Sequence, residues 1–159
     1  MKKEAVMNHF IRAVVMGDQI FAIYGEKTKS QELSQMIEDF RASFANQKKE
    51  LIKVLKDKYM MVDEECTMLQ KNAIFLERMK TMTVQNDYDL CIQIIKSMNS
   101  AIVGALKYYA KIDDEIREEF VDVIKSTLSN YENIIGKVKT YALENAEYHT
   151  SMNWSSSQE

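Results

Sequence analysis

The chain contains no proline and only four glycines in 159 residues. At average usage, a chain of this length would carry about eight prolines. Because proline and glycine mark most tight turns, their scarcity argues against a fold built from many short strands. Good helix formers dominate instead, which predicts an all-α protein. This length fits one domain of ordinary size that buries a substantial core.

Other absences narrow the class of protein further. The 21 basic and 24 acidic residues leave a formal charge of −3, whereas a nucleic-acid-binding protein needs a basic face that neutralises phosphates. No run approaches the roughly 18 apolar residues of a membrane span, and polar residues interrupt the apolar stretch that a secretory signal needs. Cys66 and Cys91 form no CxxC motif, so we expect small apolar fillers in a cytoplasmic protein. We expect neither a nucleic-acid nor a membrane partner.

Apolar residues recur at three- and four-residue spacing along four long stretches, which predicts four long amphipathic helices. Gly17 fills the one gap in the apolar seam of the first helix. Ser30 and Asn86 are good N-caps for the second and third helices, and Asp113 begins the fourth. The predicted ranges are 3–25, 30–58, 86–109 and 113–141.

A shorter amphipathic segment, 63–80, lies between the second and third long helices. Its apolar residues are Met68, Leu69, Phe75, Leu76 and Met79. Four long helices with short connections predict an up-down-up-down four-helix bundle, in which this extra short helix spans the middle connection. We expect residues 1–150 to form the single domain and residues 151–159 to form a flexible tail.

Four polar residues fall in or beside apolar seams near the middle of the four long helices. They are Asp18, Gln47, Asn99 and Asn130. Mid-helix positions of an up-down bundle come to similar heights, so we expect these side chains to meet. Polar groups inside a core cost free energy unless they are hydrogen-bonded. The sequence therefore predicts a hydrogen-bonded polar layer in the core.

The layout around these positions resembles the ferritin-like bundles. It is most similar to a bacterial ferritin-like family whose function is not established. The stretches that carry the resemblance are GDQIFAIYGEK, FANQKKELIKVL, IKSMNSAI and LSNYENII, one from each long helix. The resemblance covers most of residues 5–145 and implies a ferritin-like four-helix bundle.

Metal-binding members of that class hold two metals with two glutamates and two Glu-x-x-His motifs. Transferred to this chain, the motifs fall on 44–47 and 127–130, and the glutamate of the third helix falls on Asn99. Asp18 is the one acidic candidate on the first helix, and a shifted register on the second helix adds Glu50. This chain departs from the ligand pattern at nearly every position, which predicts a degenerate di-iron site, no cofactor, and an amide layer that fixes the register of the bundle.

A metal-binding protein is the alternative, with iron, manganese or zinc held by Asp18 and Glu50. The two histidines, His9 and His149, offer a second candidate site. The start of the first helix and the end of the fourth share one end of an up-down bundle, where the two rings would be neighbours. Because both histidines lie near the chain ends, no Ser-His-Asp or Cys-His constellation is expected. We expect no enzyme activity.

Methionine is abundant, with 11 residues. Five of these cluster around the connecting helix: Met60, Met61, Met68, Met79 and Met82. Methionine fills irregular cores and also forms adaptable binding surfaces, so this cluster is either core or a surface for a homodimer or protein partner.

These expectations lead to one hypothesis of function and two alternatives. The hypothesis is a non-catalytic structural or protein-interaction module, related to stress or spores by analogy alone. The alternatives are the metal-binding protein and a carrier of an apolar ligand in a cavity bordered by Phe44, Met98 and Tyr131.

Overall fold

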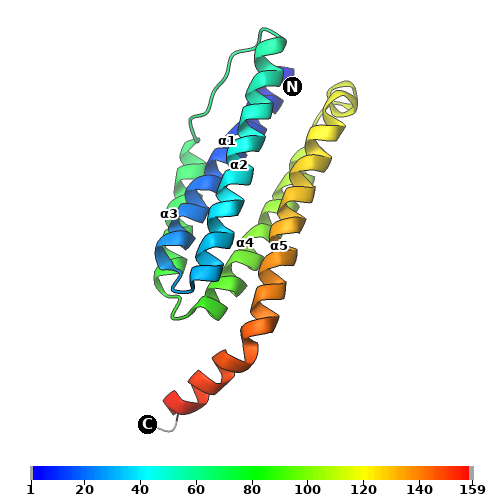
Figure 1. Ribbon diagram of the computed structural model, residues 1–159. Coiled ribbons are helices and arrows are strands. Elements are labelled where there is room, and N and C mark those ends of the chain that lie inside the picture. Colours follow the sequence, from blue (N-terminus) through cyan, green and yellow to red (C-terminus); the bar gives the residue numbers. More distant parts are fainter. Residues whose placement is uncertain (1, 158–159) are drawn as a thin grey trace.

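The structure, a computed structural model, describes the backbone of residues 2–157 and the side chains of residues 2–146. Within these residues the chain forms helices and no strand, which confirms the all-α prediction (Figure 1). The helices are α1 (Lys3–Lys27), α2 (Gln31–Asp57), α3 (Met68–Met82), α4 (Asp87–Tyr109) and α5 (Asp114–Ser157). Residues 151–157 of the predicted tail continue the α5 backbone. The side chains of the tail and residues 158–159 lie outside the described part, so its flexibility stays a prediction.

Two helices begin at the predicted caps. The Ser30 hydroxyl accepts a hydrogen bond from the backbone N–H of Leu33 at 3.3 Å at the start of α2. The Asn86 side chain accepts one from the N–H of Asp89 at 2.8 Å at the start of α4. Each cap satisfies a donor that has no partner within its own helix, so local sequence alone places these two helix starts.

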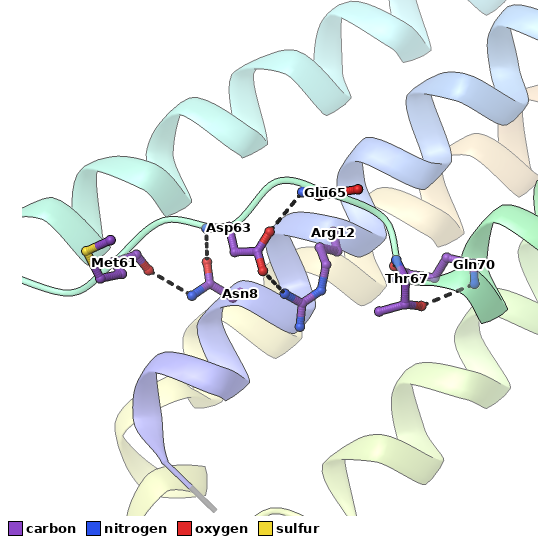
Figure 2. Close-up of polar contacts among 7 residues, drawn as sticks. All are labelled: Asn8, Arg12, Met61, Asp63, Glu65, Thr67 and Gln70. Carbon is purple, nitrogen blue, oxygen red and sulfur yellow. Dashed lines mark hydrogen bonds and ion pairs between the residues drawn. The ribbon is translucent and has the colours of Figure 1, made fainter.

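The short helix α3 begins later than predicted. Thr67 accepts a hydrogen bond from the N–H of Gln70, whose side chain accepts one from the N–H of Thr67 (Figure 2). This reciprocal capping box sets the start at Met68. The prediction of a start near Asp63 is wrong, because the segment 58–67 is not helical.

The segment between α2 and α3 lies along the N-terminal part of α1. The Asn8 side chain donates to the carbonyl of Met61 and accepts from the N–H of Asp63, both at 2.8 Å (Figure 2). Arg12, one turn further along α1, forms an ion pair with Asp63 at 3.1 Å. Asn8 is buried, so its amide holds the connection against α1 with both polar ends satisfied.

The connection ends at the opposite end of α1. There the Lys27 ammonium donates to the carbonyl of Met82, the last residue of α3, at 3.4 Å. Asp87, the first residue of α4, accepts from the N–H of Ser30, the cap of α2, at 2.6 Å. α2 and α4 therefore begin at the same end of the molecule and run in the same direction (Figure 1). The predicted up-down-up-down order is wrong, because the middle connection returns the chain along the whole of α1.

The core lies between the antiparallel pair α1–α2 and the antiparallel pair α4–α5. Gly17 occupies the predicted gap in the seam of α1, and the Phe44 ring from α2 fills it. A Cβ atom at Gly17 would lie 3.0 Å from two carbon atoms of that ring. Phe44 is fully buried and also contacts Phe21, with ring centroids 5.5 Å apart. The absent side chain therefore brings α1 and α2 close together at this level.

α2 ends at a residue in the left-handed region. Tyr59 has a φ of 57°, and the N–H of Met60 returns to the carbonyl of Leu55 at 2.9 Å. This six-residue return is typical of a helix terminus at which glycine is the usual residue. Tyr59 is 98% exposed, so its ring adds no packing that offsets the backbone strain.

Two further expectations concern cysteine and the membrane. Cys66 and Cys91 are both buried and free, as expected for apolar fillers. Burial raises the pKa of the Cys91 thiol to about 12, which keeps this thiol protonated at neutral pH. Among the described helices, none combines the length and the apolar character needed to cross a bilayer.

Candidate functional site

The structure does not assemble the predicted polar layer as a ring of four. Asn99 is exposed on α4. Asp18 is half-exposed and forms an ion pair with Arg41 of α2 at 3.0 Å. Gln47 and Asn130 do meet, between α2 and α5, with a long hydrogen bond of 3.5 Å from the Asn130 amide to the Gln47 carbonyl oxygen. Only two of the four predicted residues therefore share one site.

The Gln47–Asn130 pair belongs to a small polar cluster at the edge of the core. The Gln47 amide donates to the hydroxyl of Thr127 at 3.0 Å, and Ser43 donates to Asn130 at 2.8 Å. Thr127 is buried and donates its own proton to the carbonyl of Val123. A shallow groove lies over this cluster. The cluster fixes how α2 and α5 meet, and its amides and hydroxyls form no set of metal ligands.

The candidate metal ligands lie apart. Asp18 is paired with Arg41, whereas Glu50 is exposed at the rim of the groove between α2 and α5. Among the residues whose side chains the structure describes, no three His, Cys, Asp or Glu side chains are grouped closely enough to hold a metal ion. Nothing in the geometry of these residues therefore favours the metal-binding alternative.

His9 is stacked flat on Tyr108 of α4, with ring centroids 3.5 Å apart. Burial of the ring, together with the charge of Arg12, lowers the pKa of His9 to about 4. The side chain of His149 lies outside the described residues. The expected proximity of the two histidines rested on the up-down order. Because α5 runs in the same direction as α1 (Figure 1), its described part leads away from His9.

The three residues named for an apolar cavity are part of the packed core. Phe44, Met98 and Tyr131 are all buried in the same cluster of apolar side chains. The ring of Phe44 occupies the space that Gly17 leaves. Binding of an apolar ligand stays a prediction with no geometric support among these residues.

α3 also carries a buried carboxylate that the sequence did not indicate. Glu77 is 7% exposed and lies against α1 and α4. It accepts hydrogen bonds from the Tyr24 hydroxyl and, at 2.8 Å, from the Gln93 amide. Burial and the Glu77 charge raise the pKa of Tyr24 above its usual range, so its hydroxyl stays a donor to Glu77. This network fastens α3 to two long helices.

The inner face of α3 is otherwise poor in apolar contacts. Its two buried residues are Glu77 and Thr81, and the Thr81 hydroxyl donates to the carbonyl of Glu77 at 2.8 Å. Ile74 is the partly buried apolar residue of α3 that packs against the core. An amphipathic helix normally buries its apolar stripe. α3 instead turns a largely polar side toward the domain.

The apolar stripe of α3 points outward. Its six large side chains are about half exposed or more, up to 80% for Leu69 and 61% for Phe75. A helix turns by about 100° per residue, so this stripe lies opposite Glu77 and Thr81. We call these six residues the outer face of α3: Met68, Leu69, Phe75, Leu76, Met79 and Met82. Of the two alternatives for this segment, core or partner surface, the structure excludes core packing for these six side chains.

The sequence alone argued against the observed position of the outer face. The side opposite the apolar stripe carries Glu77 and Thr81, and a carboxylate is rarely buried without partners. That rarity favoured the opposite orientation. Only the contacts with Tyr24 and Gln93 make a buried Glu77 acceptable. The sequence placed methionines at a possible partner surface but did not settle on which side of α3 they lie.

Comparison with known proteins adds no relative. A scan against protein-family models finds no match, and searches of curated proteins and of solved structures find no significant match.

Proposed function

We propose that this protein is a non-catalytic helical-bundle module that binds another protein chain through the outer face of α3. The observation that carries the proposal is the orientation of α3, which buries Glu77 and Thr81 and exposes six large apolar side chains. Contiguous apolar surface on one element is uncommon in a protein that acts alone, and it marks interaction sites. The hydrogen bonds of Glu77 hold α3 in this orientation.

The ferritin-like class is proposed for the bundle itself. Its support is the direction of the helices: α2 and α4 run in the same direction, joined by one long connection. One such crossover is a feature of ferritin-like bundles. The proposal concerns architecture, and it assigns no metal chemistry to Asp18, Gln47, Asn99 or Asn130.

A photo-crosslinking amino acid at Leu69 tests the interaction in cells of the native host. The matched control places the same group at Lys125, an exposed residue of α5. We expect a discrete crosslinked product from position 69, absent from position 125 and lost when Leu76→Glu is added. Products of equal yield at both positions, or none at position 69, would refute the proposal. Unchanged circular dichroism of the Leu76→Glu chain shows that the bundle remains folded.

A further inference from the structure

The outer face of α3 has the spacing of a helix-pairing seam. Met68, Phe75 and Met82 recur every seven residues, and Asn72 and Met79 fall between them, which gives the spacing 4-3-4-3. This is the heptad pattern by which one helix receives the side chains of a second helix. Leu69 and Leu76 widen the seam on one side. The geometry therefore fits a helix laid along α3 better than a compact surface or an extended strand.

Positive charge is in excess around the outer face of α3. Every exposed charged residue on α3 is basic, and Lys27 of α1 adds a further base at the C-terminal end of α3. Two of these bases form ion pairs with acidic residues at 3.3 Å, whereas Lys80 has no ionic partner in the described part of the chain. The bases are Lys27, Lys71, Arg78 and Lys80, and the paired acids are Glu26 and Glu65. This surface is locally positive on a chain of net charge −3.

These charges argue against a second copy of the chain as the occupant. When two α3 helices pair in antiparallel orientation, the row Lys71–Arg78 of one helix faces the same row of the other. In a parallel pair the bases meet Leu69 and Leu76, which offer no acid. The one acidic residue of α3, Glu77, is buried on the opposite side. Lys71 and Arg78 keep their own acids, Glu65 and Glu26, and neither orientation brings an exposed acid of the second α3 to Lys80.

An anionic membrane fits the same edge of the molecule less well. The connection that leads into α3 carries Asp63, Glu64 and Glu65, all exposed, between Met61 and Met68. Each of the three pairs with a base of the chain, yet a flat anionic surface against the apolar side chains would still meet these exposed carboxylates and be repelled by them. A narrow helix lying along α3 covers less of this connection.

We propose that the outer face of α3 binds an amphipathic helix of a different protein, whose apolar seam is flanked by acidic residues. This inference rests on the proposed function and names the chemistry of its partner. Acidic side chains beside the seam meet Lys80 and the neighbouring bases, and apolar side chains cover Phe75 and Leu76. Three methionines in the face adapt to the shape of the partner, because their side chains are unbranched and flexible.

Two synthetic peptides of about 21 residues, or three heptads, test the inference. Both carry leucine at the seam positions. One has glutamate at all flanking positions, and the other has lysine. Each is labelled with a fluorophore and titrated with the full chain while anisotropy is recorded. We expect the acidic peptide to bind about tenfold tighter than the basic one at low salt, with the difference shrinking as salt screens the charges.

Variants of the full chain locate the binding. Leu76→Glu should abolish binding of the acidic peptide, because it places a carboxylate in the seam. Lys71→Glu combined with Lys80→Glu should reverse the preference between the peptides. Lys125→Glu on α5 is the matched control for charge reversal and should change neither affinity. Equal affinity for both peptides, or a preference that the double variant does not alter, would overturn the acidic partner.

The remaining outcomes separate this inference from the proposed function. No peptide binding, together with a dimer in sedimentation equilibrium that Leu76→Glu abolishes, would make a second copy the occupant. That result overturns the inference and leaves the proposed function standing. Co-sedimentation with phosphatidylserine-containing vesicles, lost in Leu76→Glu, would assign the face to a membrane and overturn both. Absence of all three interactions overturns the inference, and the crosslinking experiment then decides the proposed function.

Discussion

α1 and α3 are both amphipathic helices packed side by side, yet they bury opposite faces. α1 turns its apolar seam inward, where Phe21 and Tyr24 are fully buried. α3 packs on α1 with Glu77 and Thr81 and leaves Phe75 and Leu76 in solvent. A three-four apolar spacing therefore predicts a helix with two unlike faces. It does not predict which face lies against the domain, since a well-bonded carboxylate can take the inner position.

The sharpest test of this contrast uses the same substitution on both helices. Phe21→Ala should lower the free energy of unfolding by about 3–5 kcal/mol, because it leaves a cavity among buried rings. Phe75→Ala should change it by about 0.5 kcal/mol or less, since that ring is mostly in water. Urea denaturation monitored by circular dichroism measures both values. Similar losses in the two variants would mean that α3 buries its apolar face in solution.

The next test removes the carboxylate that holds α3. Glu77→Leu should destabilise the protein by about 2–3 kcal/mol, because the Tyr24 hydroxyl and the Gln93 amide lose their acceptor. Adding Tyr24→Phe should recover part of that loss, since one of the two donors is then gone. A double-mutant cycle in urea measures the coupling. Additive losses would show that the Tyr24–Glu77 hydrogen bond contributes nothing.

The buried side of α1 should also show in the pH dependence of stability. The pKa of His9 is about 4 in the folded chain and about 6.5 when unfolded. Between these values the unfolded chain binds the extra proton, so stability is fully present above about pH 6.5 and falls toward pH 4. With the partial exposure of the ring discounted, the loss is about 1–2 kcal/mol. His9→Phe keeps a ring against Tyr108 and lacks the titrating group. Subtracting its free energy of unfolding from that of the wild type at each pH removes the contribution of the carboxylates. A difference that does not vary with pH would contradict the lowered pKa of His9.

The smallest effects concern the predicted polar layer. Gln47→Leu should cost about 1 kcal/mol, because the buried Thr127 hydroxyl loses one hydrogen bond and keeps its other one to Val123. Asn99→Leu should change stability by about 0.5 kcal/mol or less, as its side chain lies in water. Thermal unfolding of both single variants measures the difference. A larger loss from Asn99→Leu would place that residue inside the bundle.

Local chemistry made several features predictable. Ser30 and Asn86 cap their helices as expected, because a cap depends on neighbours within three residues. Gly17 lies in the inner seam of α1 as expected. Gln47 and Asn130 meet, whereas Asn99 does not join them. The prediction of the full layer assumed that all four helices share one relative rotation, and nothing in a single helix fixes its rotation against a neighbour.

By itself, the sequence determined the helical class, most helix boundaries and the apolar seams of the long helices, since these depend on composition and on contacts a few residues apart. The tertiary structure alone decided the direction of α4 and the outward orientation of α3. The first follows from long-range hydrogen bonds that hold the connection against α1, at Asn8 and again at Lys27. The second follows from Tyr24 and Gln93, distant in sequence from Glu77, which make a buried carboxylate stable and leave the apolar face of α3 in solvent.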